Sequence, residues 1–169
     1  MSASPIFGPE PLGSDHETDD FDCGAASLNE HLAARALSDQ KAGKSRTYVI
    51  ARGQRVVGYF SMTAASIEPR DATERAAKGQ GAQAIPAVLI GRFAIASSEQ
   101  GQGLGSALLV EALRKAAAAA DTIGVRVVLV DALNEDVRGF YVRHGFGPSP
   151  TDPLHLMMLM KDVRKTLEG

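Results

Sequence analysis

The sequence predicts an α/β domain with a mixed central sheet flanked by helices, in which an antiparallel strand pair precedes a strand–helix–strand–helix–strand segment. Two β-branched and aromatic runs separated by a short turn predict the antiparallel pair. Two largely apolar runs on either side of a long alanine- and leucine-rich stretch predict parallel strands joined by a helix. The length of 169 residues fits one domain, so residues 1–169 are expected to form a single unit.

The first third of the chain predicts little regular structure before a helix. Residues 5–13 contain three prolines and are expected to be extended or irregular. Ser27 and Glu30 have the spacing of a capping box, in which Ser27 would satisfy a free helix amide and Glu30 would reach back. A stripe of Leu28, Leu32 and Ala36 then predicts a helix that ends near Gly43.

The antiparallel pair is expected over residues 47–51 and 56–63, with a hairpin turn over residues 52–55. Pro69 should end this pairing, and a short helix is expected over residues 71–78. The apolar run over residues 87–96 then predicts a central strand of the sheet.

The second half alternates helices and strands. Residues 104–120 predict a helix whose apolar face is Leu108, Leu109, Ala112, Leu113 and Ala116. Residues 125–130 predict a strand covered on both faces. Asn134 is expected to cap a helix that ends at Gly145, and residues 154–160 predict the last strand.

Composition excludes several classes of protein. No apolar run of 18 residues is present, and the first residues lack the basic segment and apolar core of a signal peptide. The only cysteine, Cys23, cannot form an internal disulfide, which fits a reducing cytoplasm. The four histidines show no metal-ligand spacing, so no metal site is expected.

Charge is unevenly distributed along the chain. Residues 1–34 hold seven acidic residues and no Lys or Arg, whereas residues 35–93 hold ten basic residues against four acidic ones. A polyanionic partner for the basic segment is one explanation, and ordinary solvated faces are the other.

The glycine-rich segment over residues 100–106 (QGQGLGS) holds the clearest chemical signal. It lies between an apolar strand and a helix N-terminus, where unpaired amides and the helix dipole favour an anion. No lysine follows the last glycine, which excludes a P-loop. Asp131 fits a dinucleotide fingerprint, but Ser106 replaces the third glycine and only 38 residues follow Asp131. A tight turn without a ligand remains the other alternative.

Gln100, Gly103 and Gly105 match the pattern Gln/Arg-x-x-Gly-x-Gly/Ala, and Phe140-Tyr141-x-x-x-Gly145-Phe146 ends the following helix. With these motifs the sequence resembles the GNAT superfamily of acetyl-CoA-dependent N-acetyltransferases. More narrowly, it resembles the acetyltransferase toxins of bacterial toxin–antitoxin pairs. That narrower resemblance comes from residues 89–94 (LIGRFA) and from an early segment with Phe21, Cys23, Gly24, Leu28 and Asn29.

The resemblance implies a parallel pair of strands that splays apart around acetyl-CoA, which would be the acetyl donor. It implies a set of cofactor-binding residues: Phe93, Ala94, Ile95, Gln100, Gly101, Gln102, Gly103, Leu104, Gly105, Ser106 and Asn134. The resemblance also places Tyr141 near the thioester sulfur, where a phenol can protonate the departing thiolate. For Asn134 the alternative role is that of a helix cap, and for Tyr141 it is that of a core residue; both alternatives remain open. A ribbon–helix–helix antitoxin and a homodimer are implied as well.

The expected reaction is direct attack of a neutral amine on the thioester. At pH 7 an α-amine of pKa about 7.7 is roughly one-sixth neutral, and a lysine amine near 10.4 far less. The strand before the loop offers Arg92 and no acid, which favours an α-amino acceptor such as aminoacyl-tRNA. Lys41, Lys44, Arg46 and Arg92 are the expected substrate-binding residues. Acetylation of a small amine or a protein N-terminus, and a silent CoA-binding or partner-binding module, are the alternatives.

Overall fold

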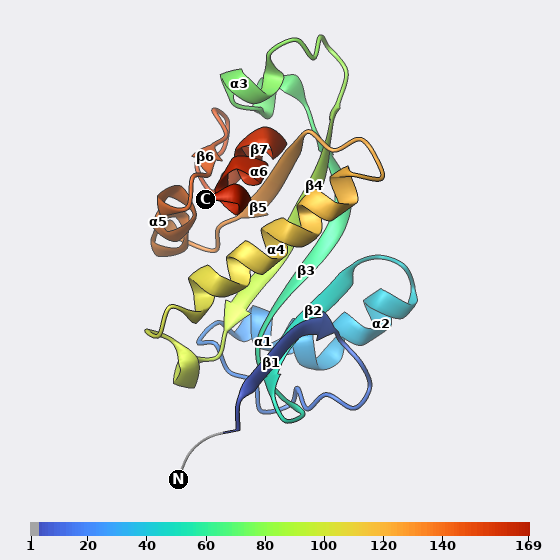
Figure 1. The fold of residues 1–169 in the computed structure, drawn as a ribbon, viewed down its shortest axis with the longest axis vertical. Helices are drawn as coiled ribbons and strands as arrows, with labels where there is room; N and C mark the ends of the chain where they lie inside the picture. The colour runs from blue at the N-terminus through green and yellow to red at the C-terminus, as the bar shows by residue number, and fades with distance from the viewer. Residues whose placement is uncertain (1–3) are drawn as a thin grey trace. The chain divides into compact units, whose positions relative to one another are not determined.

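The computed structural model describes residues 4–169 and contains a seven-stranded mixed sheet of order β1-β2-β3-β4-β5-β7-β6 (Figure 1). The strands are β1 (Ile6–Pro11), β2 (Arg46–Arg52), β3 (Arg55–Ile67), β4 (Ile85–Ile95), β5 (Val127–Asp131), β6 (Gly147–Pro148) and β7 (His155–Leu159). The helices are α1 (Ala26–Ala34), α2 (Ala36–Lys41), α3 (Glu74–Ala77), α4 (Leu104–Ala120), α5 (Glu135–Arg143) and α6 (Met160–Glu168). Two 3₁₀ turns are η1 (Pro69–Asp71) and η2 (Ser97–Glu99). The predicted mixed sheet with flanking helices is confirmed.

The chain divides into two compact units. The first unit comprises the described residues through Thr63 together with Arg92–Glu111, and the second comprises Ala64–Gly91 and Ala112–Gly169. Strands β3 and β4 and helix α4 each begin in one unit and end in the other, so three elements link the units covalently.

The first unit contains the antiparallel part of the sheet. Strands β2 and β3 pair from Arg46↔Met62 to Arg52↔Arg55, which confirms the predicted hairpin. The buried Tyr59 hydroxyl donates to the Leu28 carbonyl oxygen at 2.7 Å and so ties α1 to β3. The core of this unit is Leu12, Phe21, Leu32, Ala36, Val49, Val56, Tyr59, Ala94 and Ala96.

For the N-terminal third, one prediction was incomplete and one was wrong. Residues 5–13 were expected to be extended or irregular, and Ile6–Pro11 is extended, but it also forms strand β1, which pairs with β2 so that Pro11 lies opposite Tyr48. Proline is tolerated there because β1 is an edge strand with only one neighbour. The predicted capping box does not form: Ala25 is the N-cap of α1, and Ser27 lies inside the helix.

The second unit contains the parallel part of the sheet. Strand β5 pairs with β4 from Ala87↔Val127 to Ile90↔Val130, and with β7 from Val127↔Leu159 to Asp131↔His155. All four valine and leucine side chains of β5 are buried, which confirms the strand predicted to be covered on both faces. The core of this unit is Ile67, Ala72, Ala76, Ile85, Ala87, Val127, Leu129, Met157 and Leu159.

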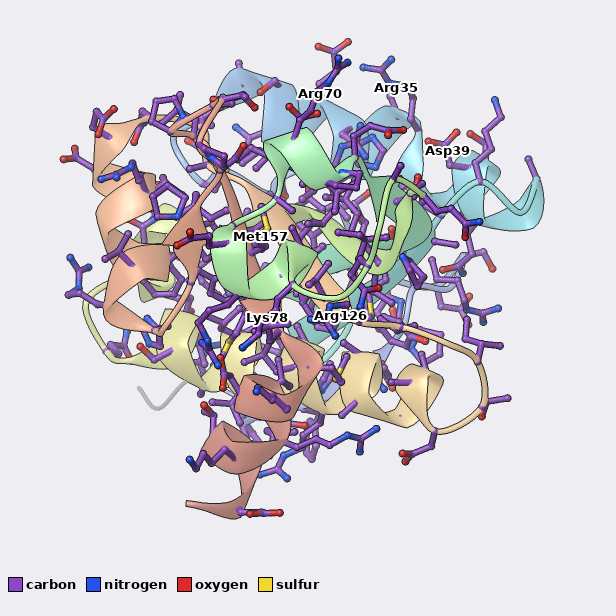
Figure 2. The ribbon with its side chains drawn as sticks, turned by 90° about the horizontal axis from the view of Figure 1, so that it is seen from above. Arg35, Asp39, Arg70, Lys78, Arg126 and Met157 are labelled. Atoms are coloured by element: carbon purple, nitrogen blue, oxygen red, sulfur yellow. The ribbon has the colours of Figure 1, made fainter. Side chains whose placement is uncertain are left out.

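One short helix and the last strand of the second unit differ from prediction. The helix expected over residues 71–78 is a 3₁₀ turn followed by the four-residue α3. The Arg126 guanidinium, seen beside α3 in Figure 2, donates to the carbonyl oxygens of Arg75, Ala76 and Lys78 and closes its C-terminus. The last predicted strand ends at Leu159 because Met160 begins α6, which buries Met160 and Val163.

The two longer helices of the second half confirm their predictions. Helix α4 spans Leu104–Ala120, and the five residues of its predicted apolar face are all buried. The Asn134 side chain accepts the Val137 amide at 3.0 Å and caps α5, as expected. No helix among residues 4–169 is long and apolar enough to cross a bilayer.

Candidate functional site

The glycine loop belongs to the first unit and leads from η2 into the N-terminus of α4. Gly101 and Gly103 have φ values of +82° and +78°, a conformation that L side chains rarely adopt. No protein atom lies within 4 Å of the position a Cβ would take at either glycine. As at any helix N-terminus, the amides of the first turn point out along the helix axis, at the positive end of the helix dipole. The loop therefore presents an open backbone surface with a positive dipole end, which suits a phosphate group.

Gln100 holds this loop rather than pointing away from the protein. Its side-chain amide donates to the Ile95 carbonyl oxygen at 2.9 Å and to the Cys23 carbonyl oxygen at 3.4 Å. Cys23 is a free, partly buried thiol that packs against the core of the first unit. The glutamine thus fixes the end of β4 against the start of the loop.

Glu99, just before the glycine loop, is a buried residue for which the sequence offered no signal. It is 6% exposed and forms a bidentate pair with Arg52, at 3.0 Å from Nε and 2.9 Å from Nη2. The hydrogen bond from Arg52 holds the pKa of Glu99 below its ordinary value, and burial opposes that shift only in part. A carboxylate that is ionised and fully paired supports the loop but cannot serve as a free base.

Glu99→Gln is expected to lower the melting temperature by a few degrees at neutral pH, because it leaves Arg52 without its counter-charge. The lowered pKa of Glu99 means that its contribution is present above about pH 4.5 and is lost as pH falls through the folded-state pKa. In thermal melts from about pH 3 to pH 7, the melting temperature of the variant should therefore fall less on acidification than that of the wild type. If the melting temperatures of the two proteins fell equally with pH, this role would be contradicted.

The predicted substrate-binding cations of the first unit lie in two settings. Lys41, Lys44 and Arg46 are exposed and follow one another through the turn from α2 to β2. No carboxylate among residues 4–169 forms an ion pair with any of the three. The structure therefore brings them together as a cationic turn.

Arg92 lies on β4 and is half-buried, also without a carboxylate partner in the described part of the chain. Its neighbour His31 is 2% exposed, and both ring nitrogens lack a hydrogen-bond partner. Burial and the charge of Arg92 lower the pKa of His31 to about 4, so the imidazole is neutral at physiological pH. The guanidinium of Arg92 is thus left to attract an anion.

The cofactor candidates on β4 differ in what they can offer. Ala94 and Ile95 are buried, whereas Phe93 is half-buried. A ligand could therefore reach Phe93 more readily than Ala94 or Ile95.

Tyr141 and Asn134 belong to the second unit. Tyr141 is 2% exposed and packs edge-to-face on Phe140 and Phe146, with ring centroids 5.4 and 5.5 Å away. Burial, and to a smaller extent the charge of Asp131, raises the pKa of the Tyr141 phenol. The phenol therefore stays protonated and can act as a donor. Within residues 4–169, no three His, Cys, Asp or Glu side chains are placed to hold a metal ion.

Comparison with known proteins identifies the family. The acetyltransferase (GNAT) domain family matches residues 43–148. The tRNA-acetylating toxin of Mycobacterium tuberculosis is 42% identical over 156 residues, which cover 92% of this chain and 93% of that protein. The chain belongs to the GNAT acetyltransferases. The family predicted from the loop and from the Phe140–Phe146 motif is confirmed.

Solved structures extend the likeness of this GNAT acetyltransferase to the whole fold. AtaT complexed with acetyl-methionyl-tRNAfMet superposes with a TM-score of 0.86 at 28% identity, covering 95% of this chain and 97% of that one. An AtaT variant bound to acetyl-CoA and the C-terminus of the antitoxin AtaR gives a TM-score of 0.83 at 27% identity, with 98% of each chain covered. AtaT has also been solved with AtaR on DNA. Acetyl-CoA, the predicted acetyl donor, is thus a ligand of a close structural relative.

Proposed function

We propose that this GNAT acetyltransferase is a toxin that acetylates the α-amino group of aminoacyl-tRNA and so blocks translation, with residues 1–169 acting as one domain in the cytoplasm. The observation that carries the proposal is the likeness over nearly the whole chain to the mycobacterial tRNA-acetylating toxin. AtaT, captured with acetyl-methionyl-tRNAfMet, supports the same acceptor class.

Acetyl-CoA would be held mainly through backbone groups. In the proposed site the amides of Gln100, Gly101, Gln102, Gly103, Leu104, Gly105 and Ser106 bind the pyrophosphate. The positive φ angles of Gly101 and Gly103, and the open space beside them, support this assignment. Phe93, Ala94 and Ile95 would contact the pantetheine arm. Asn134 would serve both as the cap of α5 and as a cofactor contact.

The chemistry needs two proton movements. The amine nitrogen forms a bond to the thioester carbonyl carbon, the carbon–sulfur bond breaks, and sulfur keeps the electron pair. Starting from the α-ammonium, nitrogen loses two protons overall; one reaches the solvent and the other accounts for the proton gained by the CoA sulfur. In our proposal Tyr141 donates a hydrogen bond and then a proton to that sulfur, and the second proton lost by nitrogen restores the phenol; the protonated, buried phenol supports this role.

The tRNA would be bound by the cationic turn of Lys41, Lys44 and Arg46, together with Arg92. Changing the three turn residues to glutamine should weaken tRNA binding and reduce the slope of log affinity against log salt by about 2–3, since each phosphate contact contributes about 0.7–0.9. Filter binding from low to moderate salt measures this slope. The variant Lys161→Gln, Arg164→Gln, Lys165→Gln removes the same charge from α6 and should leave the slope unchanged. An unaltered slope in the turn variant would remove these residues from the interface.

Cell-free translation tests the proposed consequence. The wild-type protein should stop synthesis of a reporter only when acetyl-CoA is supplied, because the acetyl group must come from the cofactor. Inhibition that does not depend on acetyl-CoA would instead favour a silent binding module.

The proposal includes a small DNA-binding antitoxin of the ribbon–helix–helix type and a homodimeric toxin. AtaT with AtaR, alone and on DNA, supports an antitoxin of this general kind. Light scattering should give twice the 17.8 kDa chain mass for the free protein. A monomer at micromolar concentration would overturn the dimer.

A further inference from the structure

A histidine–aspartate pair stands at the end of β5 in the second unit. Asp131 and His155 lie opposite each other in the antiparallel register of β5 and β7. The Asp131 carboxylate is 2.5 Å from Nδ1 of His155, so that nitrogen donates its proton to the carboxylate. No partner among residues 4–169 bonds Nε2, and the side chain is 22% exposed. This is the arrangement in which a carboxylate fixes the tautomer of an imidazole and leaves Nε2 as a proton acceptor.

His155 lines a polar pocket of about 400 Å³ formed by the end of β3, η1 and the turn between β6 and β7. Three further carboxylates line it: Glu68, Asp71 and Asp152. One wall is fixed, because Thr151 donates to Asp71 at 2.7 Å and lies 3.1 Å from the Ser149 hydroxyl. No Lys or Arg lines the pocket. Its charge therefore favours a cationic guest such as an alkylammonium group.

The pair also lies near the residue expected to act on the leaving group. Asp131 is the first residue beyond the parallel pairing of β4 and β5, which ends at Ile90↔Val130. Its charge contributes to the raised pKa of Tyr141, so carboxylate and phenol are close within this unit. One carboxylate thus influences both the imidazole and the phenol.

We propose that His155 is the general base that removes a proton from the acceptor amine, and that Asp131 is its positioning residue. This inference rests on the proposed function. The acidic pocket would hold the substrate α-ammonium, and Nε2 of His155 would take one of its protons. The neutral amine then attacks the thioester, and the second proton lost by nitrogen ends on the CoA sulfur. His155 returns its proton to the solvent, so the cycle balances.

The charges around His155 match this role. The hydrogen bond to Asp131 raises the pKa of His155 above its ordinary value, burial opposes the rise, and the charges of Asp131, Asp152 and Asp71 add to it. Glu68 faces the same pocket, and the Tyr141 phenol is uncharged. The raised pKa of His155 makes the imidazole a stronger base and brings it closer to an α-amine of pKa about 7.7, which favours proton transfer from the α-ammonium.

Single-turnover acetyl transfer to aminoacyl-tRNA from pH 6 to pH 9 tests the inference in the full-length protein. His155→Gln should slow transfer on the order of 10²-fold at pH 7, with acetyl-CoA affinity unchanged by calorimetry. The deficit should shrink toward pH 9, because the α-amine is then already neutral. Asp131→Asn should show the same pH trend with a smaller deficit. His16→Gln is the control, since His16 pairs with Glu10 at 2.8 Å in the first unit and should transfer normally.

Each outcome decides between the proposals. Equal rates for His155→Gln and the wild type at every pH would overturn the base assignment and leave the proposed function intact. A deficit that stays constant with pH would indicate a structural role and would also overturn it. If the wild type transfers nothing to aminoacyl-tRNA, the proposed function fails and this inference fails with it.

Discussion

Replacing Tyr141 with phenylalanine is expected to slow acetyl transfer by about 10²–10⁴-fold, the usual range for a positioned acid, while acetyl-CoA affinity is preserved. The ring would keep its contacts with Phe140 and Phe146, so the fold should survive. Only the hydroxyl is lost, and its effect should appear in the chemical step, as for an interaction made mainly in the transition state. Single-turnover kinetics with calorimetry for acetyl-CoA measure both quantities.

Tyr59→Phe is the matched control for this prediction. Tyr59 is also a buried tyrosine with a raised pKa, but its hydroxyl donates to the Leu28 carbonyl oxygen inside the core of the first unit. Its loss should cost about 1 kcal/mol of stability without slowing transfer. Near-wild-type transfer by Tyr141→Phe would leave Tyr141 a packing residue.

Replacing Gly103 with valine is expected to weaken acetyl-CoA binding by about 10-fold or more, the cost of losing one charge-assisted hydrogen bond. The valine side chain would occupy the open space that the proposed site reserves for the pyrophosphate. Its φ of +78° would also strain the loop. Isothermal titration calorimetry measures the affinity directly.

Gly79→Val separates strain from ligand contact. Gly79 has a φ of +76° and open space around its Cβ position, in the connection between α3 and β4. The Gly79→Val variant should have the same backbone strain as Gly103→Val, but it should bind acetyl-CoA normally. Equal affinity in both variants would remove the loop from the cofactor site.

Much of the fold was predictable because local chemistry determines it. Helix α4 needed only its apolar periodicity, and α5 only the Asn134 cap. The β2–β3 hairpin followed from β-branched runs and a short turn. Strand β1 was missed because its two prolines, Pro9 and Pro11, argue against a strand, and only pairing with β2 stabilises one there. The capping box at Ser27 failed because the N-cap of α1 is Ala25, two residues earlier, so Ser27 lies inside the helix.

The glycine loop and Tyr141 could be proposed as site residues from the sequence, because each belongs to a motif within one short segment. The site was not predictable where partners come from distant segments. Glu99 pairs with Arg52 across 47 positions of sequence, and Asp131 pairs with His155 across 24. The second pair depends on the register of β5 and β7, which neither strand reveals alone.

The His155–Asp131 pair also changes one argument made from the sequence. The absence of an acid on the strand before the loop favoured an α-amine, which needs less help from a base. A base supplied from β7 would serve other amines as well, so that argument no longer selects the acceptor. The aminoacyl-tRNA proposal now rests on the likeness to tRNA-acetylating relatives and on the cationic turn.

Direct transfer of labelled acetyl from acetyl-CoA to purified aminoacyl-tRNA tests the central claim. The wild-type protein should label the aminoacyl group, and mild base should release the label as an N-acetyl amino acid. Deacylated tRNA, free amino acids and peptides with a free N-terminus should stay unlabelled under the same conditions. Labelling of the peptides or free amino acids, with none on any aminoacyl-tRNA, would contradict the proposed function.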